Sequence, residues 1–422
     1  MTPEVKKRIE QIRQGIVPEG YVKDKDGIYP RDWASKKIGQ WLKLAERPIV
    51  LQDEEEYQLV TVRRGFGGVD SRGSFLGKNV LVKNYFIVKT GDFIISKRQI
   101  AHGACGIVPP ELDGAVVSNE YNVFLPQDGT NIQMFNLMMQ LPHYKRLFYL
   151  MSDGVHIEKL LFKTQDWMKR KLAMPLLKEQ KKIAEILATQ DKAIKLQGRK
   201  IEELKRFKQG CLEKMFPRKG QKVPEKRFPG FTDDWEQRKA KELFVSTTDK
   251  GYPELPVLSA TQDRGMIRRD ENSINIFHDK KNEAGYKRVL PGQFVIHLRS
   301  FQGGFAHSAI EGITSPAYTV FGFSEPEKHD SEYWKYVFTS KSFIQRLETV
   351  TYGIRDGRSI SYEEFLTLGF VYPSKAEQTA IARYLDKLSD LITLHQRKLE
   401  EMKRQKKALM QLLLTGIVRV KA

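Results

Sequence analysis

Residues 175–216 read PLLKEQKKIAEILATQDKAIKLQGRKIEELKRFKQGCLEKMF, and residues 373–414 read PSKAEQTAIARYLDKLSDLITLHQRKLEEMKRQKKALMQLLL. The two stretches are copies of one segment, because 15 of their 42 aligned positions are identical without a gap. Each copy begins with Pro, reaches a Glu-Gln pair and then contains no further Pro. This pattern predicts one long helix in each copy, and a repeat of this kind organises the whole chain.

Apolar residues recur at seven-residue spacing in both copies, which is typical of helices that pack against a partner helix. Polar residues occupy equivalent positions of the same row, Gln197 with His395 and Lys208 with Lys406, and polar residues in such a row often fix the register. The ten apolar residues of the expected helix-pair interface are Leu187, Ile194, Ile201, Leu204, Cys211, Leu385, Ile392, Leu399, Met402 and Leu409.

The segments that precede the two helices also correspond, although more loosely. Asp32-Trp33 matches Asp234-Trp235, and the apolar stretch that ends at Ile95 matches one that ends at Ile296. Short apolar runs between Gly, Pro and Asn predict strands joined by loops, so each segment is expected to be a mixed α/β domain. The expected divisions are a first domain at 1–174, a first spacer helix at 175–216, a second domain at 217–372 whose first part, 217–234, is a linker, and a second spacer helix with a tail at 373–422.

Composition narrows the class of protein. Lys and Arg number 71 against 52 Asp and Glu, a net charge of +19, and more than half of this excess lies in the two predicted helices and the C-terminal tail. Such a balance favours a polyanionic partner, although a solvated helix face with internally paired charges has the same composition.

Two cysteines, Cys105 and Cys211, exclude a disulfide-stapled scaffold and a four-cysteine zinc site. The chain shows no signal peptide and no run of eighteen apolar residues, so we expect a cytoplasmic protein without a membrane span.

Motifs for catalysis are missing from the sequence. The stretch GSFLGKN at residues 73–79 is one residue short of a phosphate-binding loop, and the glycine cluster at 65–68 lacks the third glycine of a dinucleotide fingerprint. The eight histidines show no paired metal-ligand spacing. We therefore expect no catalytic residue, no metal site and no cofactor in this chain.

The tandem openings EQKKIAEIL and EQTAIARYL, the two Asp-Trp pairs and the stretch DGRSISYEEF resemble the specificity subunits of type I restriction-modification enzymes over essentially the whole chain. The resemblance implies an α+β fold in which two target-recognition domains are joined by two long antiparallel helices with pseudo-two-fold symmetry. It implies a non-catalytic subunit whose two domains each read one half of an asymmetric, bipartite DNA sequence. The implied partners are double-stranded DNA, two adenine methyltransferase subunits and restriction (translocase-nuclease) subunits, with S-adenosylmethionine, ATP and magnesium on those partner subunits.

Candidate DNA contacts follow from residue type and from position in loops between predicted strands. Arg can fork onto guanine and Gln onto adenine, whereas Ser and Lys often bind phosphate. Any single member of the set has an alternative interpretation as a solvated surface residue. The candidates are Arg63, Arg64, Arg72, Lys97, Arg98, Gln99 and His102 in the first domain, and Gln262, Arg264, Arg268, Arg269, Arg299, Ser300, Gln302, Arg355 and Arg358 in the second.

Two alternatives to sequence-specific recognition stay open on the sequence alone. One is a non-catalytic helical adaptor that binds DNA without sequence specificity. The other is a self-contained nuclease or methyltransferase, which activity of the isolated chain would reveal. A short helix over residues 3–14, capped by Thr2, is expected to dock either on its own domain or on a methyltransferase subunit.

Overall fold

The structure is a computed structural model, and it describes residues 2–24, 27–154, 160–218, 220–261, 264–271, 280–297, 304–347 and 361–420. The chain divides into two units, each held together by its own contacts. Unit 1 comprises Met1–Leu196 with Lys398–Ala422, and unit 2 comprises Gln197–Arg397. Each unit therefore holds one mixed α/β domain and about half of each long helix, and the predicted α+β fold with two spacer helices is confirmed.

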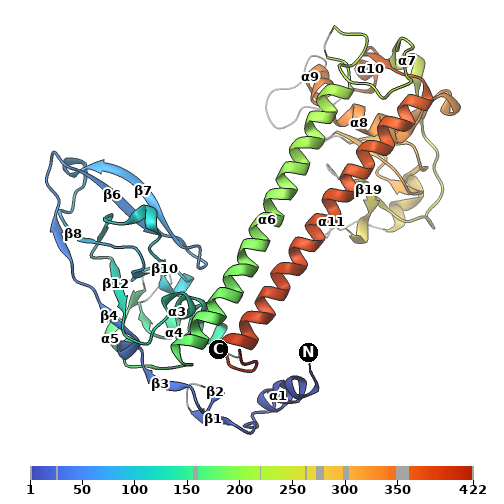
Figure 1. The fold of residues 1–422 in the computed structure, drawn as a ribbon. Coiled ribbons are helices and arrows are strands. Elements are labelled where there is room, and N and C mark those ends of the chain that lie inside the picture. Colours follow the sequence, from blue (N-terminus) through green and yellow to red (C-terminus); the bar gives the residue numbers. More distant parts are fainter. Residues whose placement is uncertain are drawn as a thin grey trace. The chain divides into compact units, whose positions relative to one another are not determined.

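Unit 1 begins with a short helix and contains most of its strands before the first long helix (Figure 1). Its helices are α1 (Pro3–Arg13), α2 (Ile38–Trp41), α3 (Ile132–Met139), α4 (Pro142–Leu150) and α5 (Thr164–Met168). Its strands are β1 (Tyr21–Asp24), β2 (Gly27–Pro30), β3 (Ala34–Lys37), β4 (Leu42–Leu44), β5 (Pro48–Val50), β6 (Glu56–Val62), β7 (Val69–Leu76), β8 (Asn84–Ile87), β9 (Phe93–Ser96), β10 (Cys105–Ile107), β11 (Val116–Ser118), β12 (Tyr121–Pro126), β13 (Ser152–Asp153), β14 (Leu161–Phe162) and β15 (Lys171–Met174).

Unit 2 repeats much of this order of elements over its described residues. Its helices are α7 (Ala240–Leu243), α8 (Ser331–Thr339), α9 (Lys341–Leu347) and α10 (Tyr362–Phe365). Its strands are β16 (Glu236–Lys239), β17 (Phe244–Thr247), β18 (Leu258–Thr261), β19 (Gly265–Arg268), β20 (Lys287–Val289), β21 (Phe294–Ile296), β22 (Phe305–His307), β23 (Gly312–Thr314), β24 (Thr319–Phe323) and β25 (Gly369–Tyr372).

The two domains share one scaffold. The four-stranded sheet of unit 1 has the order β10-β9-β12-β4, and that of unit 2 has the equivalent order β22-β21-β24-β17, with every pairing antiparallel. Each unit also pairs the strand before a four-residue helix, α2 or α7, with the strand before a long helix: β3 pairs with β15 and β16 with β25. The sequence correspondence between the domains therefore reflects a duplicated fold.

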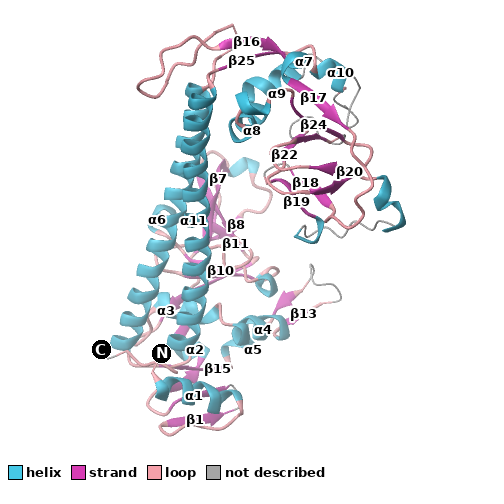
Figure 2. Ribbon diagram, turned by 90° about the vertical axis from the view of Figure 1, so that its right-hand side faces the viewer, coloured by secondary structure: helices cyan, strands magenta, loops and turns pink. Residues whose placement is uncertain are grey.

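The long helices are α6 (Leu177–Met215), with 39 residues, and α11 (Lys375–Leu414), with 40. In unit 1 the Nζ of Lys406 lies 2.6 Å from the Oδ1 of Asp191, while Arg419, which follows α11, donates to Glu179 at the start of α6. In unit 2 Lys208 donates to Ser389 at 2.7 Å, while Gln197 donates to His395 at 2.8 Å. Residue numbers thus fall along α11 as they rise along α6, so the helices run antiparallel within each unit. Figures 1 and 2 show them side by side.

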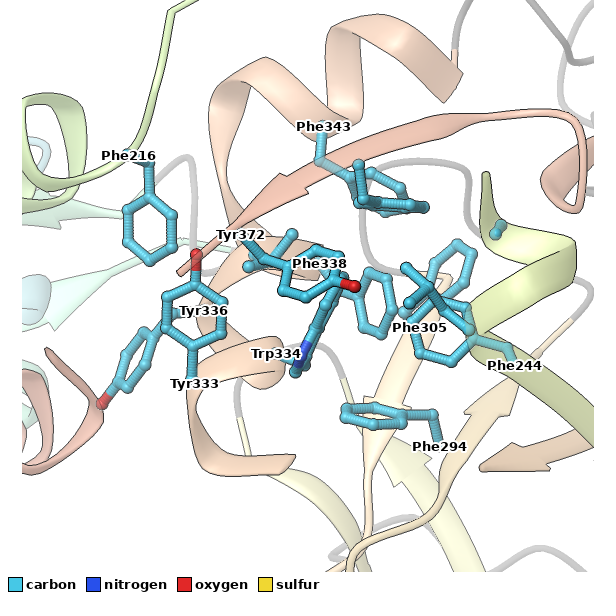
Figure 3. Packing of buried hydrophobic residues seen from close by; sticks show 14 of the residues in the cluster. Phe216, Phe244, Phe294, Phe305, Tyr333, Trp334, Tyr336, Phe338, Phe343 and Tyr372 are labelled. Atoms are coloured by element: carbon cyan, nitrogen blue, oxygen red, sulfur yellow. The ribbon is translucent and has the colours of Figure 1, made fainter. Parts of the chain in front are cut away.

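Aromatic side chains fill the core of unit 2 (Figure 3). Phe338 of α8 lies with its ring centroid 5.0 Å from that of Phe305 and 4.9 Å from that of Phe294, and Trp334 lies 5.2 Å from Phe244. Aromatic contacts of this kind add roughly 0.5–1.5 kcal/mol each beyond the area that they bury. The dense core makes the domain a firm support for the loops that leave its strands.

The Glu-Gln pair at the start of each long helix attaches that helix to its domain. Gln180 accepts from the backbone N–H of Asn131 at 2.7 Å and donates to the carbonyl of Gly129 at 2.9 Å. Gln378 likewise accepts from the backbone N–H of Asp330 at 2.9 Å. Asn131 and Asp330 are the N-cap residues of α3 and α8, so the same glutamine fixes the same helix start in both units.

The glutamates of these pairs bind arginines from the segments that follow the opposite helix. Arg419, in the tail after α11, donates to Glu179 at 2.7 and 2.9 Å and to Asp32 at 2.8 Å. Arg227, in the segment after α6, donates to both oxygens of Glu377 at 2.9 and 2.7 Å. Each long helix is therefore tied at its first turn to the chain that leaves its partner helix.

Helix α1 ends one residue before the expected end, because Gln14 is its C-cap. Thr2 caps it by accepting from the N–H of Val5 at 3.5 Å. Arg8 donates to the carbonyl of Ile417 and lies 5.3 Å from the ring centroid of Tyr21. The helix therefore docks within unit 1, beside the tail that follows α11.

Candidate nucleic-acid interface

The glycine-rich turn between β6 and β7 and the loop after β9 meet in unit 1. The N–H of Gly65 donates to the carbonyl of His102 at 2.7 Å, and the N–H of Phe66 donates to that of Gly103 at 2.8 Å. The two loops were predicted separately as DNA contacts, and the fold joins them. We call the cations on these two loops and on β7 the unit 1 cluster: Arg63, Arg64, Arg72, Lys97 and Arg98.

Carboxylates hold two members of the unit 1 cluster. Arg63 pairs with Asp70 across the β6–β7 hairpin, and the Nε of Arg98 lies 2.6 Å from the Oε2 of Glu120. Both arginines stay more than half exposed. Sequence reasoning missed these acidic partners. In the strand register Asp70 lies opposite Thr61, so its ion pair with Arg63 runs diagonally across the hairpin. The pairing orients the two guanidiniums on the surface without removing them from it.

The remaining candidates of unit 1 differ in exposure. Arg64 and Arg72 are exposed, and Lys97 is partly exposed. Gln99 is half-buried, and its side-chain oxygen is buried without a hydrogen-bond donor among the described residues. His102 is also half-buried, and its backbone carbonyl binds the β6–β7 turn. Gln99 and His102 hold the loop through their backbone groups, and the exposed cations are presented to solvent.

Unit 2 presents cations on the equivalent hairpin, β18–β19. Arg264 lies in its turn and Arg268 at the end of β19, and both are exposed. Arg269 follows and is half-buried, with its Nε and Nη1 buried without a partner among the described residues. The other six candidates of this domain lie outside the described residues: Gln262, Arg299, Ser300, Gln302, Arg355 and Arg358.

His307, at the end of β22, lies under this hairpin. Its Nε2 is 3.1 Å from the hydroxyl of Ser331, and its Nδ1 is 3.9 Å from Glu332. Burial lowers the pKa of His307 below its usual 6.5, against the opposing attraction of Glu332 and Asp386. The imidazole is therefore neutral at pH 7 and belongs to the support of the hairpin.

None of the ten apolar residues expected between the long helices is exposed. Leu187, Ile201, Leu385 and Ile392 are buried, and the other six are half-buried: Ile194, Leu204, Cys211, Leu399, Met402 and Leu409. The polar row contains Gln197, whose amide donates to the carbonyl of His395 at 2.8 Å and lies 2.9 Å from its Nδ1. This side-chain contact replaces an apolar layer and favours one register of the helices.

Within the parts of the chain that the structure describes, no three His, Cys, Asp or Glu side chains are grouped so as to hold a metal ion. No described helix is both long and apolar enough to cross a membrane. The two domains share one scaffold, and each has its own exposed cations on equivalent hairpins. Both domains also share the pair of long helices. These features define the class: a duplicated recognition protein with a helical spacer.

Comparisons with known proteins show which proteins this chain is similar to. Residues 30–206 match the family model of the type I restriction modification DNA specificity domain. The type I restriction enzyme MjaVIII specificity subunit of Methanocaldococcus jannaschii is 25% identical over 93% of this chain and 94% of its own. Over nearly its whole length the chain is therefore similar to specificity subunits of type I restriction-modification systems.

Solved structures show the same fold. A chain from a study of complex assembly and conformational transition of the type I R-M system has a TM-score of 0.57 at 16% identity, covering 92% of this chain and 99% of that one. The type I restriction-modification system S subunit from M. genitalium has a TM-score of 0.51 at 11% identity, covering 90% and 96%. The duplicated architecture is therefore shared by chains of very different sequence.

Proposed function

We propose that this chain reads an asymmetric, bipartite DNA sequence, with one half-site for each unit. The observation that carries the proposal is the combination of one scaffold with two different sets of exposed cations. The hairpin β6–β7 and its neighbouring loop present Arg64, Arg72 and Lys97, whereas β18–β19 presents Arg264 and Arg268. A dimer of identical readers would match a palindrome, but two unlike readers match two unlike half-sites.

The charge pattern supports duplex DNA as the ligand. The chain carries a net charge of +19, and phosphate contacts supply much of the affinity of any DNA-binding protein. Arginine is the side chain that most often reads guanine in the major groove, through two parallel hydrogen bonds. The exposed arginines of the two hairpins are therefore the proposed base contacts, and the lysines are the proposed phosphate contacts.

The unread gap between the half-sites is proposed to depend on the long helices. At 1.5 Å per residue, the 39 residues of α6 span about 58 Å. One turn of DNA is roughly 34 Å long, so the helix is longer than one turn. Two adenine methyltransferase subunits are the proposed partners of the helix pair, with restriction subunits in the full complex. S-adenosylmethionine, ATP and magnesium are expected on those subunits, and the cytoplasm is the expected compartment.

A domain exchange tests the proposal. Residues 1–170 are replaced by the equivalent domain of a relative with a different target, and the chain is co-expressed with methyltransferase subunits in a host without adenine methylation. Single-molecule sequencing then gives the methylated sequence, and we expect only one half of it to change. A change in both halves would contradict the assignment of one half-site to each unit.

Competition binding separates sequence reading from non-specific adhesion. The complex is bound to its methylated target sequence and to a duplex of scrambled sequence over a range of salt concentrations. Specific readers bind their site about 10³–10⁷ times more tightly than other DNA, whereas non-specific binding is equal for all sequences and falls steeply with salt. Equal affinity for both duplexes would support a helical adaptor instead.

A further inference from the structure

The tip of the β6–β7 hairpin has a backbone conformation that side chains rarely adopt. Phe66 has a φ of +60°, and it is the one non-glycine residue with a positive φ among those that the structure describes. Such a conformation costs energy and persists only where neighbouring structure holds it, which happens most often at functional sites. Something specific must therefore fix Phe66.

The loop after β9 supplies that restraint. The backbone N–H groups of Gly65 and Phe66 donate to the carbonyls of His102 and Gly103 at 2.7 and 2.8 Å. The Phe66 ring lies directly on Gly103: a Cβ added there would be 2.9 Å from the Cε2 of Phe66. Gly103 itself has a φ of +76°, which suits glycine. The ring also packs against the hydrophobic core of unit 1, so the tip is anchored and not a free loop.

The same close approach continues into the strands. A Cβ on Gly106 of β10 would lie 3.1 Å from the Cγ2 of Val69 and 3.2 Å from the Cα of Gly68. Within the turn, a Cβ on Gly67 would lie 2.8 Å from the Cβ of Arg63. Gly103 and Gly106 therefore allow the hairpin to approach the loop after β9 and strand β10 at backbone distance, whereas Gly67 keeps the turn itself tight.

Unit 2 docks its own hairpin in the same way with different residues. Met266 of β19 forms a parallel bridge with Ser308, which follows β22, and Gly265 has a φ of +68°. A Cβ on Gly265 would lie 2.3 Å from the carbonyl oxygen of His307. In both units a glycine thus allows the hairpin to lie close to the neighbouring backbone. This is expected if the position of the hairpin matters for the function of each unit.

We infer that the β6–β7 turn is the base-reading element of unit 1, with Arg64 as its reading side chain, and that Phe66 is the positioning residue that holds it through Gly103. The inference rests on the proposed function and assigns it to one element. Arg64 is exposed and directly precedes Gly65 and Phe66, whose backbone N–H groups bind the loop after β9, so the backbone that carries its side chain is held in place. Two-pronged contact with a base needs such a fixed backbone, because its geometry tolerates little movement.

Four variants test the inference in the complex of the full chain with methyltransferase subunits. R64A removes the proposed reader, F66A removes the anchor, and F66L keeps an apolar side chain on Gly103. G103A places a methyl group against the ring. G114A is the matched control, because Gly114 has a φ of +81° and a Cβ there meets no atom within 4 Å. The readout is the ratio of methylation rates on the target and on targets with one base changed, for each half-site in turn.

We expect R64A, F66A and G103A to lower that ratio in the same half-site by about 5- to 150-fold, the range for loss of one two-pronged base contact, and to leave the other half-site unchanged. F66L should recover part of the loss, and G114A should match the unaltered chain. Melting temperatures measured in parallel show whether a variant is folded.

Unaltered selectivity in folded F66A and G103A would overturn the inference, and so would an equal loss in G114A, since backbone strain alone would then explain the effect. A loss in both half-sites would also overturn it. If the unaltered chain directs methylation to no defined sequence, the proposed function is wrong and the inference falls with it. If the unaltered chain directs methylation to a defined sequence but the variants do not change selectivity as expected, the inference alone is wrong.

Discussion

Replacing Arg227 with methionine removes the partner of a deeply buried carboxylate. The Nε and Nη2 of Arg227 donate to the two oxygens of Glu377 at 2.9 and 2.7 Å, and the side chain of Glu377 is 1% exposed. Breaking a buried ion pair from one side typically costs about 3–5 kcal/mol, because the remaining charge stays without solvent. We therefore expect R227M to lower the free energy of unfolding of unit 2 by about 3 kcal/mol or more.

Two further variants isolate the cause. R227M combined with E377Q removes both charges, so it should recover part of the stability that R227M loses. K182M removes one partner of a surface pair with Glu185, whose side chains are 49% and 66% exposed, and should cost less than about 1 kcal/mol. The comparison separates the burial of the charge from the simple loss of a salt bridge.

Urea denaturation followed by circular dichroism gives the free energies, and hydrogen exchange of peptides from the first turns of α11 shows where the loss occurs. Faster exchange should be confined to unit 2. If R227M and K182M lose the same small amount, the ion pair does not anchor α11. If the double variant is as unstable as R227M, the buried charge is not the reason for the loss.

Three other outcomes are expected. Because burial lowers the pKa of His307, the unfolded chain binds a proton at this histidine at higher pH than the folded chain does. The free energy of unfolding should therefore fall as the pH drops below about 6.5, by up to about 1.4 kcal/mol per pH unit. H307Q should remove this part of the slope in urea titrations at different pH, and an unchanged slope would contradict the prediction. Insertion of seven residues after Gly198 and after Gln396 keeps the apolar rows in register and lengthens each long helix by about 10 Å. The gap between the two halves of the methylated sequence should therefore grow by roughly three base pairs. An unchanged gap in an active complex would refute the spacer role. Burial raises the pKa of the Cys105 thiol well above its usual range, so iodoacetamide should label half-buried Cys211 first in the folded chain, and mass spectrometry showing equal labelling would contradict this placement.

The repeat and its seven-residue spacing were sufficient to predict two long helices that pack against a partner helix, because a narrow apolar row has few ways to become buried. Their antiparallel direction was implied only by the resemblance to specificity subunits. Leu187 and Leu385 are buried in the hydrophobic cores of unit 1 and unit 2. The role of the Glu-Gln pair was not predicted. Its glutamine binds an N-cap 48 or 49 residues away, and its glutamate binds an arginine 150 or 240 residues away. Local patterns do not report such distances.

The cationic loops could be found from residue type alone, but their grouping could not. Arg63 and Arg98 were equal candidates in the sequence, and only the fold shows that Asp70 and Glu120 orient them. The packing of the Phe66 ring on Gly103 is likewise a property of tertiary structure.

The amino-acid sequence by itself determined the duplication, the helices and the strongly basic character of the chain, since periodicity, identity between repeats and charge are properties of the order of residues. Tertiary structure alone decided which loops meet, which cations are oriented by carboxylates and which hairpin tip is anchored. The physical reason is that hydrogen bonds, ion pairs and steric contacts act over a few ångströms in space, whatever the separation of their residues along the chain.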